Sequence, residues 1–343
     1  INRLGMVGVA SAVAVAGYSL YSILKTNPSQ KPLGPMPVEE FFAKNDPPES
    51  YDKIEKEMEE FVRKNKSSGR RIVCVTGGGT TVPLERNTVR FIDNFSTGRR
   101  AAISVEYFLQ KGYGVLYLRR RGSVDAFSRH LQDDLKTKNF DSSFLKAFTL
   151  DSKESKASIS ISNKTAIALK AFAKANKTGM LKSVEFESCN DYFFLLRAAS
   201  QAMQIAQKQS MMYFAAAVSD FFMEDQPTHK IQSSDGPLTL VLRQTPKLLG
   251  VLRRLWAPDV MCVSFKLETD VNILIKKAKR AIHKYGVDAV VANELKSRYT
   301  TVKIVTLTDI KEISISDRGS EEIEEKIIDF LHNLHGSFIR KPA

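Results

Sequence analysis

Short apolar segments alternate with amphipathic helical patterns along most of this chain, and this alternation limits the possible folds more than any other feature. The apolar segments have the length of buried strands and cover residues 72–76, 114–118, 212–218, 260–265 and 289–292. Helical patterns with one apolar face cover residues 48–66, 98–111, 191–207, 270–285 and 320–334. Buried strands separated by helices predict βαβ units. We therefore expect an α/β fold, a doubly wound, Rossmann-like parallel sheet with helices on both faces.

The N-terminal part of the chain differs from the rest. Residues 5–24 carry no charge and have the length of a segment that spans a bilayer. Both a membrane anchor and a targeting or signal segment fit this pattern. The stretch KTNPSQKPLGPMP that follows is typical of a linker, because its prolines and polar residues do not pack as a helix. We therefore divide the chain into an apolar leader (1–25), a linker (26–47) and one domain (48–343), and expect a cytoplasmic protein that the leader, if it is an anchor, holds at a membrane.

The charge of the chain indicates anionic ligands. The 343 residues include 51 Lys and Arg against 38 Asp and Glu, a formal net charge of +13. These basic residues are scattered, and no RNA- or DNA-binding pattern is present, so we expect phosphorylated small molecules and no nucleic acid. The three cysteines, Cys74, Cys189 and Cys262, lie far apart without metal-ligand spacing. They are typical of free thiols in a reduced, intracellular protein.

A long polar loop follows the first predicted strand and reads GGGTTVPLERNTVRFIDNFSTGRR. In a doubly wound sheet, ligands bind beyond the carboxyl ends of the strands. The glycines at 77–79 have no Cβ, so their backbone can approach a ligand closely. Ser96 and Thr97 stand at a predicted helix start, where free N–H groups favour a phosphate. This pattern predicts a phosphate site, although turns without a ligand share it.

A nicotinamide-dependent oxidoreductase is one alternative, because VTGGG opens many dinucleotide sites. That class usually has an acidic residue after the second strand, whereas this chain has LRRRGS there, with no carboxylate before Asp125. The arginines would instead suit a 2′-phosphate. A Tyr and a Lys four residues apart, as a short-chain dehydrogenase requires, occur at 107/111 and 299/303, but neither pair follows a middle strand. The residues alone leave this alternative open.

Eight motifs occur in a defined order along the chain: VTGGGTTVPLE, NTVRFIDNFSTGRRAA, GYGVLYL, YFAAAVSDFF, THKIQSSDGPL, PKLLGVLRRLWAP, SFKLETD and VVANEL. Their order and spacing resemble eukaryotic phosphopantothenate–cysteine ligase, also called phosphopantothenoylcysteine synthetase, over residues 72–339. The resemblance implies a homodimer that joins 4′-phosphopantothenate to L-cysteine through an acyl-adenylate in coenzyme A biosynthesis. ATP would be the co-substrate, with Mg²⁺. A catalytically inactive module that binds pantetheine or a nucleotide is the non-enzyme alternative.

Residues that match the family's motifs take its roles by resemblance. Contacts to ATP are implied for Gly78, Ser96, Gly98, Phe265 and Asn293. Contacts to phosphopantothenate are implied for Asn94, Ala216, Ala217 and Asp220, with Arg90 entering from the partner subunit. The catalytic residues implied are Asn94, Arg90 and Lys230, the last of which resembles the lysine near the nucleotide phosphates.

Physical chemistry supports these roles. A guanidinium such as that of Arg90 binds phosphate in a bidentate way, and a cation such as Lys230 stabilises charge that develops on an attacked phosphate. One departure is Ala101, since the family usually has glycine after GRR. A Cβ there would crowd a triphosphate if the nucleotide approached the backbone at this point.

Overall fold

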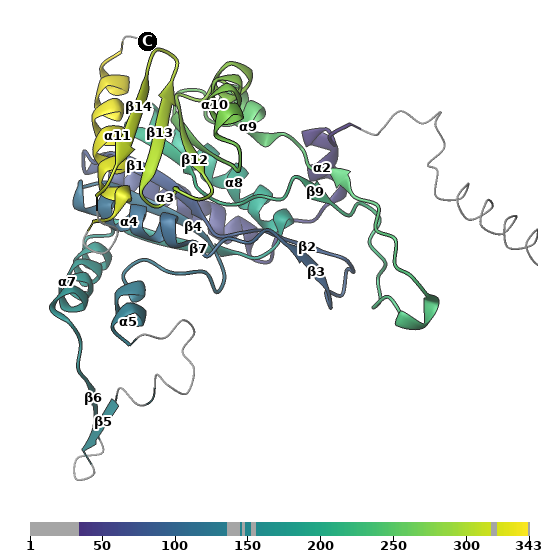
Figure 1. Cartoon of the computed structure of the whole chain (residues 1–343), viewed down its shortest axis with the longest axis horizontal. Coiled ribbons are helices and arrows are strands. Elements are labelled where there is room, and N and C mark those ends of the chain that lie inside the picture. Colours follow the sequence, from purple (N-terminus) through teal and green to yellow (C-terminus); the bar gives the residue numbers. More distant parts are fainter. Residues whose placement is uncertain (1–33, 136–144, 146–147, 152–155, 317–320, 342–343) are drawn as a thin grey trace, which may run out of the picture.

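A computed structural model describes residues 34–135, 145, 148–151, 156–316 and 321–341 (Figure 1). Its centre is a sheet of eight strands. In chain order the strands are β1 (Ile72–Gly77), β4 (Gly114–Arg120), β7 (Leu181–Phe186), β8 (Ser210–Phe214), β11 (Met261–Glu268), β12 (Ala289–Glu294), β13 (Thr301–Thr306) and β14 (Ile310–Ser314). In space they follow the order β14–β13–β12–β11–β8–β1–β4–β7.

The parallel part of this sheet confirms the predicted doubly wound fold. Strands β7, β4, β1, β8, β11 and β12 pair in parallel, and the chain reverses its direction of winding between β1 and β8. The hairpin of β13 and β14 adds two antiparallel strands at one edge, so the sheet is mixed rather than wholly parallel. The main feature for function is the switch point between β1 and β8, because ligands of such sheets bind beyond it.

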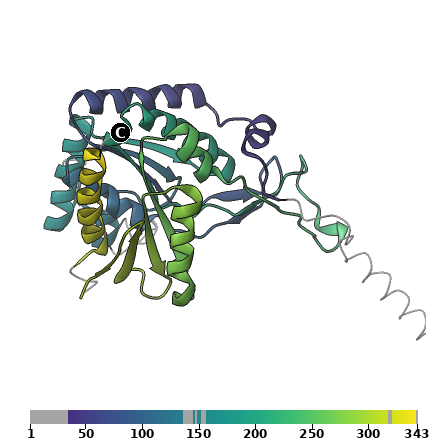
Figure 2. The same ribbon diagram turned by 90° about the horizontal axis from the view of Figure 1, so that it is seen from above.

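Helices cover both faces of the sheet, as predicted. One face carries α3 (Tyr51–Ser67), α8 (Cys189–Gln204) and α10 (Val271–Tyr285), and the other carries α4 (Arg99–Gln110) and α11 (Ile323–Arg340). Helix α10 illustrates how the sequence pattern places a helix on the sheet. Its apolar residues recur at helical spacing and are buried against the sheet, namely Leu274, Ala278, Ala281 and Ile282. Figure 2 shows α10 and α11 on opposite sides of the C-terminal strands.

Residues 133–187 carry no motif, and the sequence suggested only an insertion or a helical excursion. The segment in fact contains an integral strand, β7, which pairs with β4 at the edge of the sheet. It also contains helix α7 (Asn163–Lys177) and the small hairpin of β5 (Phe148–Asp151) and β6 (Lys156–Ile159). The sequence pattern did not predict this strand, because LKSVEF mixes polar with apolar residues, as is typical of an edge strand.

The predicted linker, residues 26–47, includes a packed helix. Helix α2 (Val38–Lys44) lies within it, and Phe41 is buried. The Phe41 ring meets those of Phe193 and Phe222 edge-on, with centroids 5.2 and 5.8 Å away. The chain therefore packs on the domain from Met36 onward, whereas residues 26–33 lie outside the described residues.

An arm projects from the body of the domain (Figure 1). It combines two small hairpins, one of β2 (Thr81–Pro83) with β3 (Phe91–Asp93), and one of β9 (Phe221–Phe222) with β10 (Arg243–Gln244). Main-chain bonds join the arm's loops, since Arg86 N–H donates to Pro227 O at 2.9 Å. The sequence pattern did not predict these short strands.

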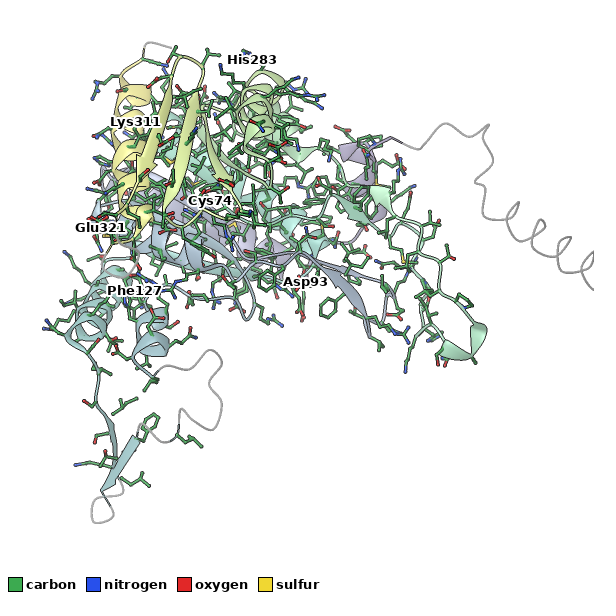
Figure 3. The ribbon with its side chains drawn as sticks, viewed as in Figure 1. Cys74, Asp93, Phe127, His283, Lys311 and Glu321 are labelled. Carbon is green, nitrogen blue, oxygen red and sulfur yellow. The ribbon has the colours of Figure 1, made fainter. Side chains whose placement is uncertain are left out.

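A buried ion cluster ties α4 to α5 (Ser128–Asp134) and to the start of α11. Arg129 is 1% exposed, and its guanidinium pairs with Glu106 and Glu322, both at 2.6 Å. The second Glu106 oxygen lies 2.7 Å from His130 Nε2. Phe127, labelled in Figure 3, donates its main-chain N–H to Glu106 at 2.9 Å. The cluster therefore fixes α5 to the domain.

We correct the prediction of a cytoplasmic protein held by a membrane anchor. Across the part of the chain that the structure describes, every helix is too short or too polar to cross a bilayer. Residues 5–24, on which the prediction was based, lie outside the described residues.

Candidate active site

The carboxyl ends of β1 and β8 continue side by side into the loops that follow them. Ala217 N–H donates to Gly78 O at 2.8 Å, and Thr80 N–H donates to Ala217 O at 3.1 Å. Ala216 N–H donates to the hydroxyl of Thr76 at 3.3 Å. The structure thus brings the predicted residues Gly78, Ala216 and Ala217 together at the switch point.

The glycines of the first loop make room for the chain itself. Gly78 has a φ of +90°, which favours glycine, and a Cβ there would lie 2.5 Å from Arg120 Cβ. A Cβ on Gly79 would lie 1.7 Å from Asn94 O. The lack of a Cβ at both positions thus lets the segments of Asn94 and Arg120 lie close to the loop, which explains these glycines without a ligand.

Ala101 also has a structural explanation. Its side chain is buried, and a Cβ on Gly77 would lie 2.3 Å from Ala101 Cβ. The Ala101 methyl therefore occupies the space that Gly77 leaves open, on the inner face of α4.

The start of α4 carries two predicted nucleotide contacts. Gly98 is the N-cap with a φ of +76°, and its N–H donates to Ser96 Oγ at 3.4 Å. The N-cap itself has no side chain, but Thr97 Oγ1 accepts from the N–H of Arg99, the first residue of the helix, at 3.4 Å. The start of a helix is suited to an anion, and the contact of Ser96 and Gly98 with a nucleotide phosphate stays a prediction.

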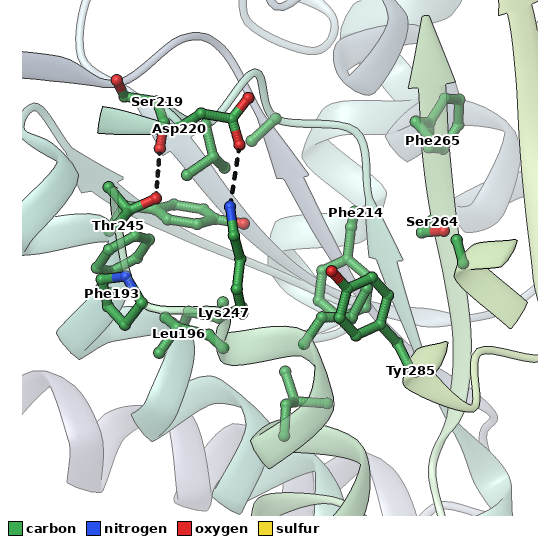
Figure 4. A pocket seen from close by; sticks show the side chains of 18 of the residues that line it. Phe193, Leu196, Phe214, Ser219, Asp220, Thr245, Lys247, Ser264, Phe265 and Tyr285 are labelled. Atoms are coloured by element: carbon green, nitrogen blue, oxygen red, sulfur yellow. Dashed lines mark hydrogen bonds and ion pairs between the residues drawn. The ribbon is translucent and has the colours of Figure 1, made fainter. Parts of the chain in front are cut away.

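A pocket of about 310 Å³ opens between the ends of β8 and β11 and the helices α8, α9 (Leu248–Val251) and α10 (Figure 4). Three of the predicted residues line it, namely Ala216, Asp220 and Phe265. The Phe265 ring packs edge-on against Tyr213, with centroids 4.9 Å apart. The pocket is therefore a mixed polar and aromatic cavity at the carboxyl edge of the sheet.

Two lysines line this pocket that the sequence did not predict as site residues. Lys247 Nζ lies 3.3 Å from Asp220, and Lys266 lines the wall beside Phe265. Tyr285 of α10 lines the same pocket. Both lysines lie inside motifs that carry the family resemblance, PKLLG and SFKLETD, and their place in these motifs could have marked them as candidate site residues. The pocket wall thus includes two lysine side chains, which are cations that can bind a phosphate group.

Asn293 lies at the end of β12, beside this pocket. Its side-chain N–H₂ donates to Val291 O at 3.0 Å and to Lys266 O at 3.3 Å. Its Oδ1 is buried and has no partner among the described residues, and the same holds for Ser264 Oγ on β11. Buried acceptors without partners are rare in folded proteins, so this edge has unused hydrogen-bonding capacity.

The arm carries the remaining predicted residues, Arg90 and Lys230, and neither lines the pocket of its own chain. Arg90 pairs with the buried Glu85 at 3.0 Å and donates to Ile231 O at 3.0 Å. Burial acts to raise the pKa of Glu85, but main-chain N–H groups of Arg90, Ile231 and Val89 outweigh it and lower that pKa. Lys230 is exposed next to Ile231. The arm thus brings the segments of Arg90 and Lys230 together.

Beneath the loops, two titratable side chains stay neutral. Burial raises the pKa of Tyr192, so its hydroxyl remains protonated and donates to Thr76 Oγ1 at 3.5 Å. Burial likewise raises the pKa of the Cys189 thiol to about 12. Cys189 is thus an unreactive part of the floor rather than a nucleophile.

The strand order and the pocket at the switch edge define a doubly wound α/β protein of the Rossmann-like class. Residues 195–333 match the family described as "DNA/pantothenate metabolism flavoprotein C-terminal domain". A phosphopantothenate–cysteine ligase of Oryza sativa subsp. japonica is 41% identical over 311 residues, which cover 88% of this chain and 93% of the relative. The Homo sapiens ligase is 41% identical over 293 residues, covering 82% and 92%.

A solved structure agrees with these relatives. It is a Cab2 mutant described as a complex with phosphopantothenate-cysteine, with a TM-score of 0.76 and 35% sequence identity, covering 88% of this chain and 98% of that chain. The chain therefore belongs to the phosphopantothenate–cysteine ligase family. The oxidoreductase alternative loses its support, since the Gly-rich strand and loop belong to a ligase.

Proposed function

We propose that this chain forms an amide between the carboxyl group of 4′-phosphopantothenate and the amine of L-cysteine, using ATP and passing through an acyl-adenylate. The observation that carries the proposal is 41% identity to a phosphopantothenate–cysteine ligase over 88% of the chain. The pocket at the switch edge, lined by Ala216, Asp220 and Phe265, supports it. The reaction belongs to coenzyme A biosynthesis.

The two substrates occupy neighbouring parts of the carboxyl edge in this proposal. The nucleotide is held by Gly78, Ser96, Gly98, Phe265 and Asn293. Phosphopantothenate is held by Asn94, Ala216, Ala217 and Asp220, together with Arg90 of a second copy. The start of α4, where the helix dipole favours an anion, supports the first set, and so does Asn293 Oδ1, which has no partner among the described residues. The main-chain bonds between the Gly78 and Ala217 segments support the nearness of the two sets.

The chemistry consists of two steps. A carboxylate oxygen of phosphopantothenate attacks the α-phosphorus of ATP, and pyrophosphate leaves with the electron pair of the broken P–O bond. The cysteine amine then attacks the acyl carbon, loses a proton, and AMP leaves. Lys230 stabilises negative charge in the first step, and the Asn94 amide donates to the oxyanion of the second.

Mg²⁺ would enter this site with the nucleotide. Within the described ranges, no group of three or more His, Cys, Asp or Glu side chains forms a metal cage. Mg²⁺ commonly binds through substrate phosphates and keeps several waters. The ion would neutralise phosphate charge, and we assign no protein ligand to it.

The arm is the proposed dimer contact. Several apolar side chains on it are exposed, including Val89, Phe91 and Phe95 of the first hairpin and its following loop, and Leu238 and Val241 of the second. Apolar side chains that gather on a projecting arm are typical of a surface that a partner covers. A second copy is the partner that would also bring Arg90 to the neighbouring site.

ATP is expected to support ligation better than CTP, with pyrophosphate and AMP as products. The motifs SFKLETD and VVANEL, which resemble the ATP-using type, carry this expectation. The measurement incubates the protein with phosphopantothenate, cysteine and either nucleotide, and follows the amide by mass spectrometry. Equal or better use of CTP would contradict the nucleotide assignment. Absence of amide with both nucleotides would favour the inactive binding module, and hydride exchange with a nicotinamide would restore the oxidoreductase.

Mixing two inactive variants is expected to restore activity if Arg90 serves the neighbouring site. In a mixed dimer of Arg90→Ala and Asn94→Ala subunits, one site keeps both residues. Random exchange should therefore give about a quarter of wild-type activity, because half the dimers are mixed and each has one complete site. Native mass spectrometry verifies the mixed dimer. No activity in that species would show that Arg90 and Asn94 act within one chain.

A further inference from the structure

Thr80 joins three segments that the ligase assignment places in the active site. Its side chain is fully buried between the glycine loop and β2. Its N–H donates to Ala217 O at 3.1 Å, and its own carbonyl accepts from Asn94 N–H at 3.2 Å. Its hydroxyl oxygen accepts from Ser219 N–H at 3.0 Å. One residue thus connects the loop of Asn94 with the segment 215–220 that follows β8.

Two further buried threonines hold the segment 215–220. Thr76 Oγ1 accepts from Ala216 N–H at 3.3 Å, and Thr245 Oγ1 donates to Ser219 O at 3.0 Å (Figure 4). A buried main-chain N–H without a partner is costly and rare. The course of this segment therefore depends on side-chain hydroxyls as well as on main-chain bonds such as that from Ala217 N–H to Gly78 O. Among these threonines Thr80 alone also bonds the main chain of Asn94.

We propose that Thr80 is a positioning residue for ligation: its hydroxyl and main chain hold Asn94 and the segment 215–220 at the separation that the acyl group and the nucleotide require. The proposal rests on the function assigned to Asn94, Ala216, Ala217 and Asp220 above. Thr80 acts through these residues and contacts no substrate itself. Its role would be to keep the oxyanion donor aligned with the bound acyl carbon.

Replacing Thr80 by valine tests this, because valine keeps the shape of the side chain and removes the acceptor. The buried Ser219 N–H then lacks its partner, and the segment must shift to find another. A misplacement of about 1 Å in a catalytic site costs on the order of 100-fold in rate. Thr80→Ser retains the hydroxyl and serves as the rescue variant.

Thr81 supplies a matched control. It is the next residue, it is also buried, and its hydroxyl donates to Glu187 O at 3.0 Å. Thr81→Val is therefore the same chemical change at nearly the same place, but it leaves intact the bond from Ser219 N–H to the Thr80 hydroxyl, the bond that Thr80→Val removes. If Thr80 contributed only to stability, Thr80→Val and Thr81→Val would change kcat and KM by similar amounts.

The readouts are the KM for phosphopantothenate and the ratio of acyl-adenylate to amide in a single turnover. Neither depends on the fraction of enzyme that is folded, and the melting temperature separately reports the stability of the fold. Thr80→Val is expected to lower kcat by about 10- to 100-fold, to raise KM about tenfold and to accumulate acyl-adenylate. Thr80→Ser and Thr81→Val should remain within about threefold of wild type, the range of a change that leaves catalytic geometry intact.

The proposal is overturned if Thr80→Val matches Thr81→Val, or if only its melting temperature falls. Failure of the proposed function gives a different result, since the wild-type protein would then form no amide. Calorimetry of phosphopantothenate binding still tests Thr80 in that case. Thr80→Val must weaken binding about tenfold while Thr81→Val does not, because misaligned contacts lose affinity even without chemistry, and equal affinities would refute the proposal.

Discussion

Replacing Asn94 by aspartate is expected to slow amide formation by about two to three orders of magnitude, the scale of losing one donor to an oxyanion. The Asn94 N–H donates to Thr80 O, which fixes the main chain. Its side-chain amide makes no hydrogen bond within the described residues, so it is available to a substrate. An aspartate would accept rather than donate and would place a negative charge where another develops.

The two half-reactions should separate in this variant. In the proposed mechanism, adenylation depends on cations such as Lys230 and not on Asn94, so pyrophosphate release in a single turnover should persist while acyl-adenylate accumulates. Lys230→Gln should do the reverse and suppress the first step. Asn176→Asp, the same change on the exposed surface of α7, controls for an added charge. Quenched reactions are quantified by mass spectrometry. Amide formation at the wild-type rate, or a block of pyrophosphate release as complete as that of Lys230→Gln, would refute this division of roles.

The sequence predicted the parts of the sheet that are buried on both faces. The strands β1, β4, β8, β11 and β12 are continuous apolar runs because helices cover them on each side. Edge strands such as β7 and β14 are partly exposed to solvent, and polar residues interrupt their apolar ones. Their sequences therefore contain no continuous apolar run that would predict a strand. The arm was missed because residues 221–222 and 243–244 pair only through tertiary contacts, across about twenty residues of loop.

The candidate site was partly predictable for a similar reason. Loops after buried strands are where ligands bind in this fold, so Gly78, Ala216 and Phe265 were expected at one edge. The structural roles of Gly78 and Gly79 could not be predicted, because the sequence does not show that Arg120 Cβ and Asn94 O fill the space next to them. The hydroxyl contacts of Thr80 depend on backbone positions that no motif encodes.

Replacing Arg129 by methionine is expected to lower the free energy of unfolding by about 3–5 kcal/mol, the cost of leaving buried charges without a partner. Methionine is long and apolar, so lost volume contributes little. Glu106 and Glu322 would lose a guanidinium that lies 2.6 Å from each. Arg99→Met is the control, because its pair with Asp133 is 37% and 49% exposed and should contribute about 0–1 kcal/mol. Denaturant midpoints measure both variants.

The pH dependence of this loss separates charge from packing. Burial by itself raises the pKa of Glu106, but hydrogen bonds from His130 and Arg129 outweigh it and lower that pKa from 4.5 to about 2. The folded-state pKa is thus below the unfolded one, so this stabilisation is fully present above pH 4.5 and is lost as pH falls toward 2. Without Arg129, only His130 and the Phe127 N–H offset the burial of Glu106, so its pKa rises above the wild-type value and acid neutralises this carboxylate at a higher pH in the folded variant. The difference in unfolding free energy between wild type and Arg129→Met should therefore shrink as the pH falls from about 7 to about 4. A difference that stays constant over that interval would mean that Arg129 stabilises the domain by filling space, and that the ion cluster contributes no net electrostatic stability.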